Sequence, residues 1–190
     1  MNYRIRSYTF KDFGNQVRLF HGSIAPGIMI GGFMVDLAYQ NLPADSIFDS
    51  ISETAKCLPD AVQLLTPCTI GNRWLKIINV GRFALAFYDK YSGGGVRIQL
   101  DYSKLNQWPE INTWFFKLIP KKEQNSQSLL AEIKEAGTTI LTITGIKVKL
   151  ELLGKKATAS VPVCPVCNKV YQSADGFICP DCCSKILPYA

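Results

Sequence analysis

Four cysteines near the C-terminus have the residue type and the spacing of a metal site. Cys164 and Cys167 form one C-x2-C pair, Cys179 and Cys182 form a second, and eleven residues separate the pairs. Four thiolates at this spacing can close tetrahedrally around one ion, for which zinc is the expected metal and iron in a rubredoxin-like site the alternative. The neighbouring Cys183 leaves a C-x3-C pairing with Cys179 open.

Two disulfides are the other way to use these four thiols, and they require an oxidising compartment. The chain starts at residues 1–4 without an apolar signal segment, so we expect a reducing, cytoplasmic location. Under that expectation the thiols that do not bind metal are free.

The metal ligands need a small module to position them. We expect two short strands at residues 169–172 and 176–178 and a helix at 182–187, which together suggest a treble-clef zinc finger spanning residues 157–190. So few large apolar side chains bury too little surface to fold alone, and metal binding must supply the stability. The polar stretch 154–160 marks the boundary with a core domain of residues 1–156.

The core domain reads as α+β. At 47% hydrophobic and 19% charged residues, the composition is that of an ordinary globular protein. Apolar spacing and proline positions predict helices, whereas branched and aromatic runs predict strands. The predicted helices are 10–20, 26–42, 60–65, 108–116 and 128–135, and the predicted strands are 47–54, 74–80, 82–88, 95–100 and 146–152.

Two classes of partner are not expected. The longest apolar run, residues 24–35, is much shorter than the roughly 20 residues that span a bilayer, so no membrane anchor is expected. The net charge of +6 permits nucleic-acid binding, but the basic residues are scattered and form no stripe with aromatics.

Two segments of the core resemble a known family. Residues 20–27 read Phe-His-Gly-Ser-Ile-Ala-Pro-Gly, and residues 57–72 contain Cys-Leu-Pro-Asp-Ala-Val-Gln followed by Thr-Pro-Cys-Thr-Ile-Gly. These segments resemble the His-Gly-His-x-Cys-Pro-Gly and Cys-x-x-Asp-Ala-x-Gln-x-x-Thr-Gly-Cys-Thr-x-Gly motifs of the FmdE family of formylmethanofuran dehydrogenase proteins. Residues 81–84 and 94–98 continue the resemblance.

The resemblance implies a thioredoxin-like mixed β-sheet flanked by helices, often as a homodimer. It implies a cleft where the two motifs meet and, in many members, a C-terminal zinc module. It also links the chain to molybdenum or tungsten enzymes of methanogenesis-related one-carbon metabolism in anaerobes, whose subunits become possible partners.

The chain departs from the family at the cleft. Ser23 stands in place of the second histidine and Ala25 in place of the cysteine, which leaves His21, Cys57 and Cys68 as the remaining possible ligands. We therefore expect weak metal binding or none in the cleft, and one zinc per chain at the C-terminal cysteines. The alternative roles are a hydrogen-bonded histidine at a helix end and two small, buried apolar side chains.

Three functions follow from these observations. The preferred one is an accessory or binding protein of the FmdE type, more so than a stand-alone enzyme. The second is an independent thiol or metal-dependent enzyme in which Cys68 is the nucleophile and His21 its base. The third is a nucleic-acid-binding or regulatory protein that uses the zinc module.

Overall fold

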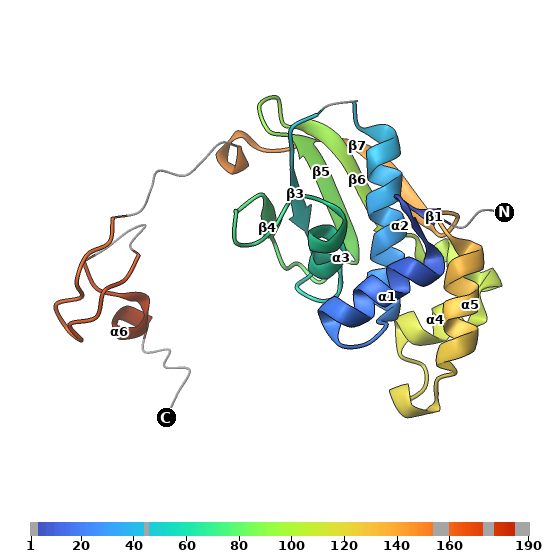
Figure 1. Ribbon diagram of the computed structural model, residues 1–190. Helices are drawn as coiled ribbons and strands as arrows, with labels where there is room; N and C mark the ends of the chain where they lie inside the picture. Colours follow the sequence, from blue (N-terminus) through green and yellow to red (C-terminus); the bar gives the residue numbers. More distant parts are fainter. Residues whose placement is uncertain (1–3, 44–45, 154–159, 173–176, 185–190) are drawn as a thin grey trace. The chain divides into compact units, whose positions relative to one another are not determined.

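The protein is described by a computed structural model that covers residues 4–43, 46–153, 160–172 and 177–184 (Figure 1). The chain divides into two compact units, Met1–Leu153 and Gly154–Ala190.

The helices of the first unit begin at residues suited to that position. Thr9 caps the first helix, because its side chain accepts a hydrogen bond from the main-chain N–H of Asp12. Pro26 occupies the first turn of the second, where its missing N–H costs nothing. The main helices are α1 (Phe10–His21), α2 (Pro26–Asn41), α3 (Leu58–Leu65), α4 (Pro109–Phe116) and α5 (Ser126–Ala136), close to the predicted ranges, and the short 3-10 helices are η1 (Tyr102–Gln107), η2 (Lys121–Glu123) and η3 (Leu150–Leu152).

A five-stranded mixed sheet has the order β4-β3-β5-β6-β7. Strands β3 and β4 are parallel and α3 connects them, while the other neighbours are antiparallel. This arrangement confirms the α+β class and the mixed, thioredoxin-like sheet. The strands are β3 (Phe48–Ser52), β4 (Leu75–Ile77), β5 (Ala84–Asp89), β6 (Gly94–Leu100) and β7 (Leu141–Lys147), and a separate hairpin joins β1 (Arg4–Ile5) to β2 (Tyr8–Thr9).

The predicted last strand, residues 146–152, is wrong in position. Strand β7 ends at Lys147, and residues 150–152 form η3. The alternation beyond Lys147 has another cause, because Val148 and Leu152 turn inward to pack against the sheet beyond the last residue of β7. The branched residues between Thr138 and Thr144 were the better signal for the strand.

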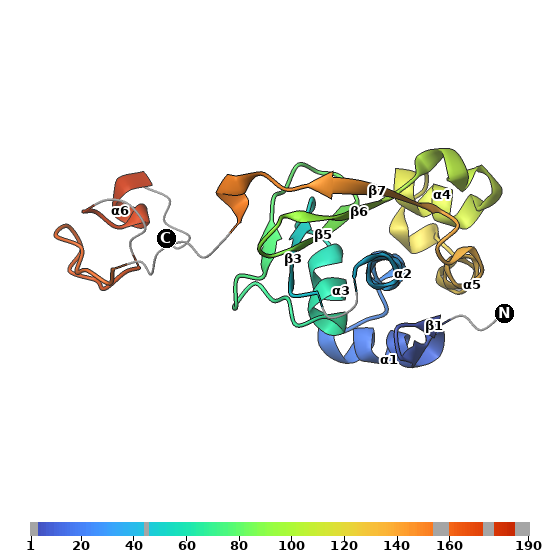
Figure 2. The ribbon, with the colours of Figure 1, turned by 90° about the horizontal axis from the view of Figure 1, so that it is seen from above.

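Helices α1, α2 and α3 lie on one side of the sheet (Figure 2), where the main hydrophobic core forms. Two glycines of α2 permit close packing inside this core. A Cβ on Gly31 would lie 2.7 Å from Cβ of Ala61 on α3, and a Cβ on Gly32 would lie 2.5 Å from Cε1 of Phe13 on α1. Both glycines therefore serve contacts within one chain.

On the opposite face, the end of the first unit is held by a buried ionic cluster. The Lys76 ammonium donates to Oδ2 of Asp49 at 3.1 Å, to the Tyr88 hydroxyl at 2.6 Å and to the Leu152 carbonyl at 2.9 Å. Asp49 is only 3% exposed, so its charge needs these partners. The Lys90 ammonium lies 3.5 Å from Oδ1, the second carboxylate oxygen of Asp49. The cluster fixes η3 on the sheet just before the unit ends.

Within the described part of the chain, no helix is both long and apolar enough to cross a membrane.

Candidate metal centre and the His21 site

The first cysteine pair lies on a tight turn in the second unit. Asn168 adopts a left-handed conformation at φ 56°, which asparagine tolerates better than most residues. Its N–H donates to the Cys164 carbonyl at 2.9 Å and closes the turn. On either side, Val163 and Val170 form an antiparallel bridge.

The second pair lies at the start of helix α6 (Pro180–Ser184). Cys179 precedes the helix and Cys182 lies within its first turn, so both thiols point toward the sulfur atoms of the first pair. The four sulfur atoms all lie within 4.8 Å of one another, and those of Cys167 and Cys179 are 3.7 Å apart. Sulfurs at tetrahedral positions on an ion with bonds of about 2.3 Å are about 3.8 Å apart. The donor set therefore fits one metal ion.

The structure decides between Cys182 and Cys183. The group of potential ligands contains Cys182, whereas Cys183 is exposed and outside it. The N–H of Cys183 donates to the Cys179 carbonyl at 2.9 Å as part of the helical turn. Two C-x2-C pairs thus form the centre.

Main-chain N–H donors lower the pKa of the Cys164 thiol and so favour its thiolate form. The N–H of Cys179 lies 3.5 Å from the Cys164 sulfur. With further N–H groups of Cys167 and Val166, this donor lowers the pKa of Cys164 to about 6. Without an ion the four sulfurs cannot all ionise, and the neighbouring Cys179 raises the pKa of Cys182 to about 12. An ion removes this conflict because it binds all four as thiolates.

The structure differs from the predicted zinc finger in two details, the strand pairing and the start of the helix. The pairing in the described residues runs from Val163 to Val170 across the first turn, whereas Phe177 and Ile178 form a bend and no strand. The helix begins at Pro180, two residues before the predicted start, because proline is favoured in a first helical turn. Residues 173–176 of the predicted hairpin and residues 185–187 of the predicted helix lie outside the described residues.

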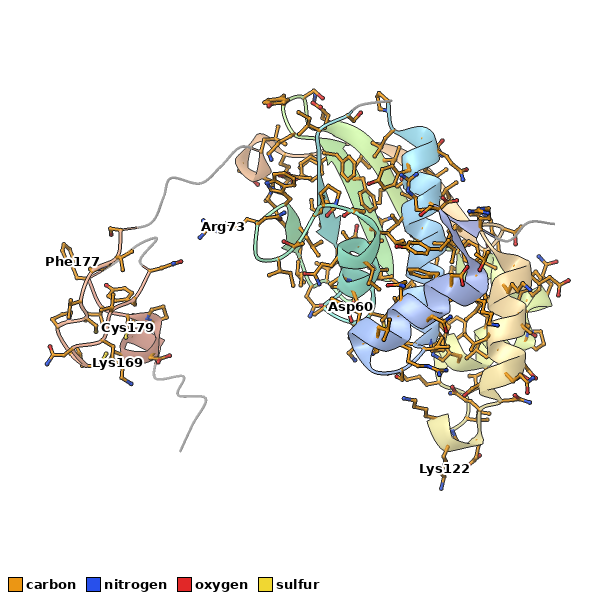
Figure 3. The ribbon with its side chains drawn as sticks, in the orientation of Figure 1. Asp60, Arg73, Lys122, Lys169, Phe177 and Cys179 are labelled. Carbon is orange, nitrogen blue, oxygen red and sulfur yellow. The ribbon has the colours of Figure 1, made fainter. Side chains whose placement is uncertain are left out.

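The second unit exposes most of its large apolar side chains. Phe177 is 92% exposed (Figure 3), and four valines, at positions 161, 163, 166 and 170, are each more than half exposed. Among the described residues of this unit, the buried apolar side chains are only Cys164 and Cys179. The unit therefore has a cluster of four cysteines, placed suitably for a metal ion, and almost no hydrophobic core among its described residues.

In the first unit, His21 pairs with an acid that the sequence analysis did not single out. Its Nδ1–H donates to Oδ2 of Asp60 at 2.8 Å, joining the end of α1 to the first turn of α3. Asp60 is labelled on α3 in Figure 3. The only signal for Asp60 was its place in the family motif, three residues after Cys57. Ser23 is exposed in the bend that follows α1.

Cys57 lies beside this pair in a strained conformation. It caps α3 with φ 58° and ψ −52°, which a residue with a Cβ rarely adopts. A Cβ on Gly27 would lie 2.9 Å from its sulfur and 3.5 Å from the ring of Phe83, so only glycine fits there. Phe83 packs in turn against Trp114 and Phe115. Burial raises the pKa of Cys57, and the Asp60 carboxylate adds to the effect.

Cys68 lies at the other end of α3. It follows Leu65, the last helical residue, and the helix of eight residues is about 12 Å long. Its thiol is buried and donates to the Phe48 carbonyl at 3.5 Å. Burial raises its pKa, although hydroxyl groups of Ser50 and Thr66 partly offset this. Cys68 therefore does not meet His21, and the four C-terminal cysteines are the only group of metal-ligating side chains gathered within the described residues.

These pKa directions predict slow alkylation of both thiols. Because the raised pKa keeps Cys57 and Cys68 protonated at neutral pH, iodoacetamide should modify them more slowly than free N-acetylcysteine. Their rates should rise only above the pH at which an ordinary thiol ionises. Peptide mass spectrometry of the metal-loaded protein measures each rate, with exposed Cys183 as the internal control. Faster modification of Cys57 than of N-acetylcysteine would show an activated thiol.

Comparison with known families gives a match over most of the first unit. Residues 20–147 match the family described as FmdE, molybdenum formylmethanofuran dehydrogenase operon. The matched range begins one residue before His21 and ends at the last residue of β7, so it contains the whole His21 site and the sheet.

Two similar proteins extend the comparison. A crystal structure of a tungsten formylmethanofuran dehydrogenase FmdE-like protein from Syntrophus aciditrophicus is 46% identical, with a TM-score of 0.90 over 100% of both chains. A probable S-adenosyl-L-methionine-binding protein from Archaeoglobus fulgidus is 27% identical over 157 residues, which are 76% of this chain. The chain spans only 43% of that relative, so its name describes a larger protein.

Proposed function

The chain belongs to the FmdE family, which is associated with molybdenum formylmethanofuran dehydrogenase operons, and from this premise we propose an accessory role. It acts in the cytoplasm as an accessory or binding protein of a molybdenum or tungsten enzyme of this type, in one-carbon metabolism. Subunits of that enzyme are its partners, and the chain is not a stand-alone enzyme.

The state of the His21 site is the observation that carries this proposal. Asp60 already engages Nδ1 of His21, and Cys68 lies at the far end of α3. Both thiols near α3 have raised pKa values, so neither is an activated nucleophile. A histidine–carboxylate pair that joins two helices is suited to holding a ligand or a partner segment. It lacks the partners that the thiol-enzyme alternative requires.

The ion of the C-terminal centre is zinc, one per chain, in a structural role. Four sulfur donors with no open position are typical of structural zinc, whereas catalytic zinc keeps a position for water or substrate. The centre holds together a unit that has almost no apolar core.

The exposed apolar side chains of the second unit form the docking surface for the enzyme. We define this surface as Val161, Val163, Val166, Val170 and Phe177. Isolated exposed apolar residues are common, but so many on one small unit indicate a protein contact. Phe177, at 92% exposure, is the side chain with the most area to bury.

A binding experiment tests the proposal. The full chain is immobilised, and purified molybdenum and tungsten formylmethanofuran dehydrogenase-type enzymes are passed over it. We expect a complex whose dissociation constant rises about tenfold in Phe177→Ser, which removes an aromatic anchor. Tyr91→Ser is the matched control, because Tyr91 is 76% exposed on the first unit. Absence of a complex with either enzyme, or equal losses in both variants, would refute this function.

A further inference from the structure

Gly145 leaves a gap in the side-chain layer beside the last strand of the sheet. It is an exposed residue of β7, and a Cβ built on it would meet nothing within 4 Å. Its neighbours on the same face are apolar, because Val96 pairs with Gly145 across the ladder and Ile143 precedes it by two residues. Both neighbours pack against the main core and stay partly exposed. The gap is therefore apolar and open to a side chain that comes from outside.

The gap lies at an open strand edge. In the order β4-β3-β5-β6-β7 the strand β7 is terminal, and among the described residues it pairs only with β6 (Figure 2). It has seven residues, whereas β4 at the opposite edge has three. A long open edge without proline or a bulge is a template for another strand.

The register of β7 on β6 determines which main-chain groups face outward. The ladder is bracketed by two hydrogen bonds of 2.9 Å, from the N–H of Val148 to the Gly93 carbonyl and from the N–H of Asp101 to the Ile140 carbonyl. Hydrogen-bonded and open pairs alternate in an antiparallel ladder, so even-numbered residues of β7 bond to β6. The odd-numbered residues therefore point their N–H and carbonyl groups away from the sheet.

Three of these outward residues have unused main-chain groups. Leu141 is satisfied locally, because its N–H donates to the Thr138 carbonyl at 3.0 Å and its carbonyl accepts from the Lys104 ammonium at 2.5 Å. The outward groups of Ile143, Gly145 and Lys147 have no hydrogen-bond partner within the part of the chain that the structure describes. An added strand can bond to all three.

Positive charges lie at both ends of this edge. Lys147 is exposed and is the only charged residue in β7. At the other end, the Lys104 side chain is 39% exposed, and its ammonium is 3.8 Å from the Asp101 carboxylate, a long ion pair. Carboxylates on an added strand are therefore favoured opposite each end of β7.

We propose that the outer edge of β7 binds an extended, acidic and apolar segment of another protein, which adds in antiparallel orientation as a sixth strand. Along its own direction, the segment has an acidic residue opposite Lys147, a large apolar residue opposite Gly145 and a β-branched residue opposite Ile143. These three residues form hydrogen-bonded pairs with β7, which gives about six hydrogen bonds. The main-chain bonds supply affinity, while the gap and the charges select the sequence.

The gap favours a foreign segment over a second copy of this strand. Side chains directly opposite each other in an antiparallel pair lie on the same face of the sheet, so the large apolar side chain covers Gly145 and contacts Val96 and Ile143. A second β7 centred at this position would set glycine against glycine and leave the gap unfilled. The inference concerns another surface than the docking surface of the second unit, and it does not rest on the accessory function.

A synthetic peptide tests the proposal. The probe is acetyl-Glu-Thr-Leu-Thr-Val-Thr-Glu-amide, whose leucine lies opposite Gly145 and whose two glutamates lie opposite Lys147 and Leu141. On titration into the isotope-labelled, metal-loaded full chain, we expect saturable shifts of the amide NMR signals of Ile143, Gly145 and Lys147. Hydrogen exchange of these three amides should slow in the complex, because each donates to the peptide.

N-methylation of the peptide separates strand pairing from other kinds of contact. A methyl group on the leucine nitrogen removes a donor to the edge and should abolish binding. The same change on the threonine that follows leucine is the matched control, because that N–H faces away from β7. It should leave the dissociation constant unchanged.

Variants of the chain test the side-chain preferences. Gly145→Val fills the gap without strain in the single chain and should raise the dissociation constant at least about tenfold. Lys147→Glu should also weaken binding, and a peptide with lysine in place of its first glutamate should restore it. Thr144→Val is the matched control, because Thr144 is exposed on the other face of the strand.

Several results would overturn the proposal. They are no saturable shift with the unmethylated peptide, binding that survives N-methylation at leucine, and equal affinity of Gly145→Val and the wild type. Slow exchange of the amides of Ile143, Gly145 and Lys147 without peptide would also overturn it, because a second copy or another part of the chain would then already cover this edge.

Discussion

Removing the bound ion should unfold the C-terminal unit and leave residues 1–153 folded. Among the described residues of that unit, only Cys164 and Cys179 are buried apolar side chains, and both belong to the four-cysteine cluster that could hold the ion. The binding free energy of structural zinc is about 10–16 kcal/mol in small fingers and is nearly all of their folding free energy. The first unit has its own core around α2 and the sheet, so it does not depend on the ion.

A chelator and one ligand variant give the measurement. After treatment with a strong chelator, or in Cys179→Ser, amide NMR signals of residues 160–184 should collapse to unfolded positions while those of the first unit stay. Cys183→Ser is the matched control, because Cys183 is exposed and lies outside the centre. Elemental analysis should find one zinc in the full chain and none in a truncation lacking residues 157–190. Metal retained in the truncation would instead place an ion in the first unit.

Local signals in the sequence predicted most of the elements. Pro26 and the glycine-rich apolar run define α2 without reference to the rest of the fold, since its residues are buried all round. The paired cysteines likewise predicted the four-cysteine cluster from spacing alone. The choice between Cys182 and Cys183 depended on which thiol the α6 turn directs at the other three sulfur atoms, and cysteine spacing alone does not specify this.

Long-range pairings were harder to predict. His21 and Asp60 are 39 residues apart, and no periodicity links them. The position of β7 was wrong because alternation continues into Val148 and Leu152, where packing on Tyr88 and Ile51 replaces strand pairing. The Lys76 cluster joins residues up to 76 positions apart. Such contacts follow from how the elements pack, which composition and spacing do not specify.

Because α2 packs closely against α1, we expect the substitution Gly32→Ala to lower the free energy of unfolding. On helix propensity alone, alanine in place of glycine inside a helix stabilises by about 1 kcal/mol. At Gly32 the added Cβ would lie 2.5 Å from Cε1 of Phe13 and 3.0 Å from Cγ2 of Ile5. Phe13 and Ile5 are fully buried and cannot move aside cheaply. Overpacking of this kind costs about 1–3 kcal/mol. Because a contact of 2.5 Å calls for the upper end of that range, the propensity gain of about 1 kcal/mol leaves a net loss of roughly 2 kcal/mol.

Gly14 on α1 separates the gain in helix propensity from the cost of overpacking, because it is also a buried glycine inside a helix. A Cβ there would meet its nearest atom, Cδ1 of Ile24, at 3.5 Å, which is ordinary contact. Urea denaturation should therefore show Gly14→Ala stabilised and Gly32→Ala destabilised, although propensity predicts a gain for both. Combining Gly32→Ala with Phe13→Leu should recover part of the loss, since the smaller side chain vacates the space. If Gly32→Ala were as stable as Gly14→Ala, α1 and α2 could not be packed as closely as they are here.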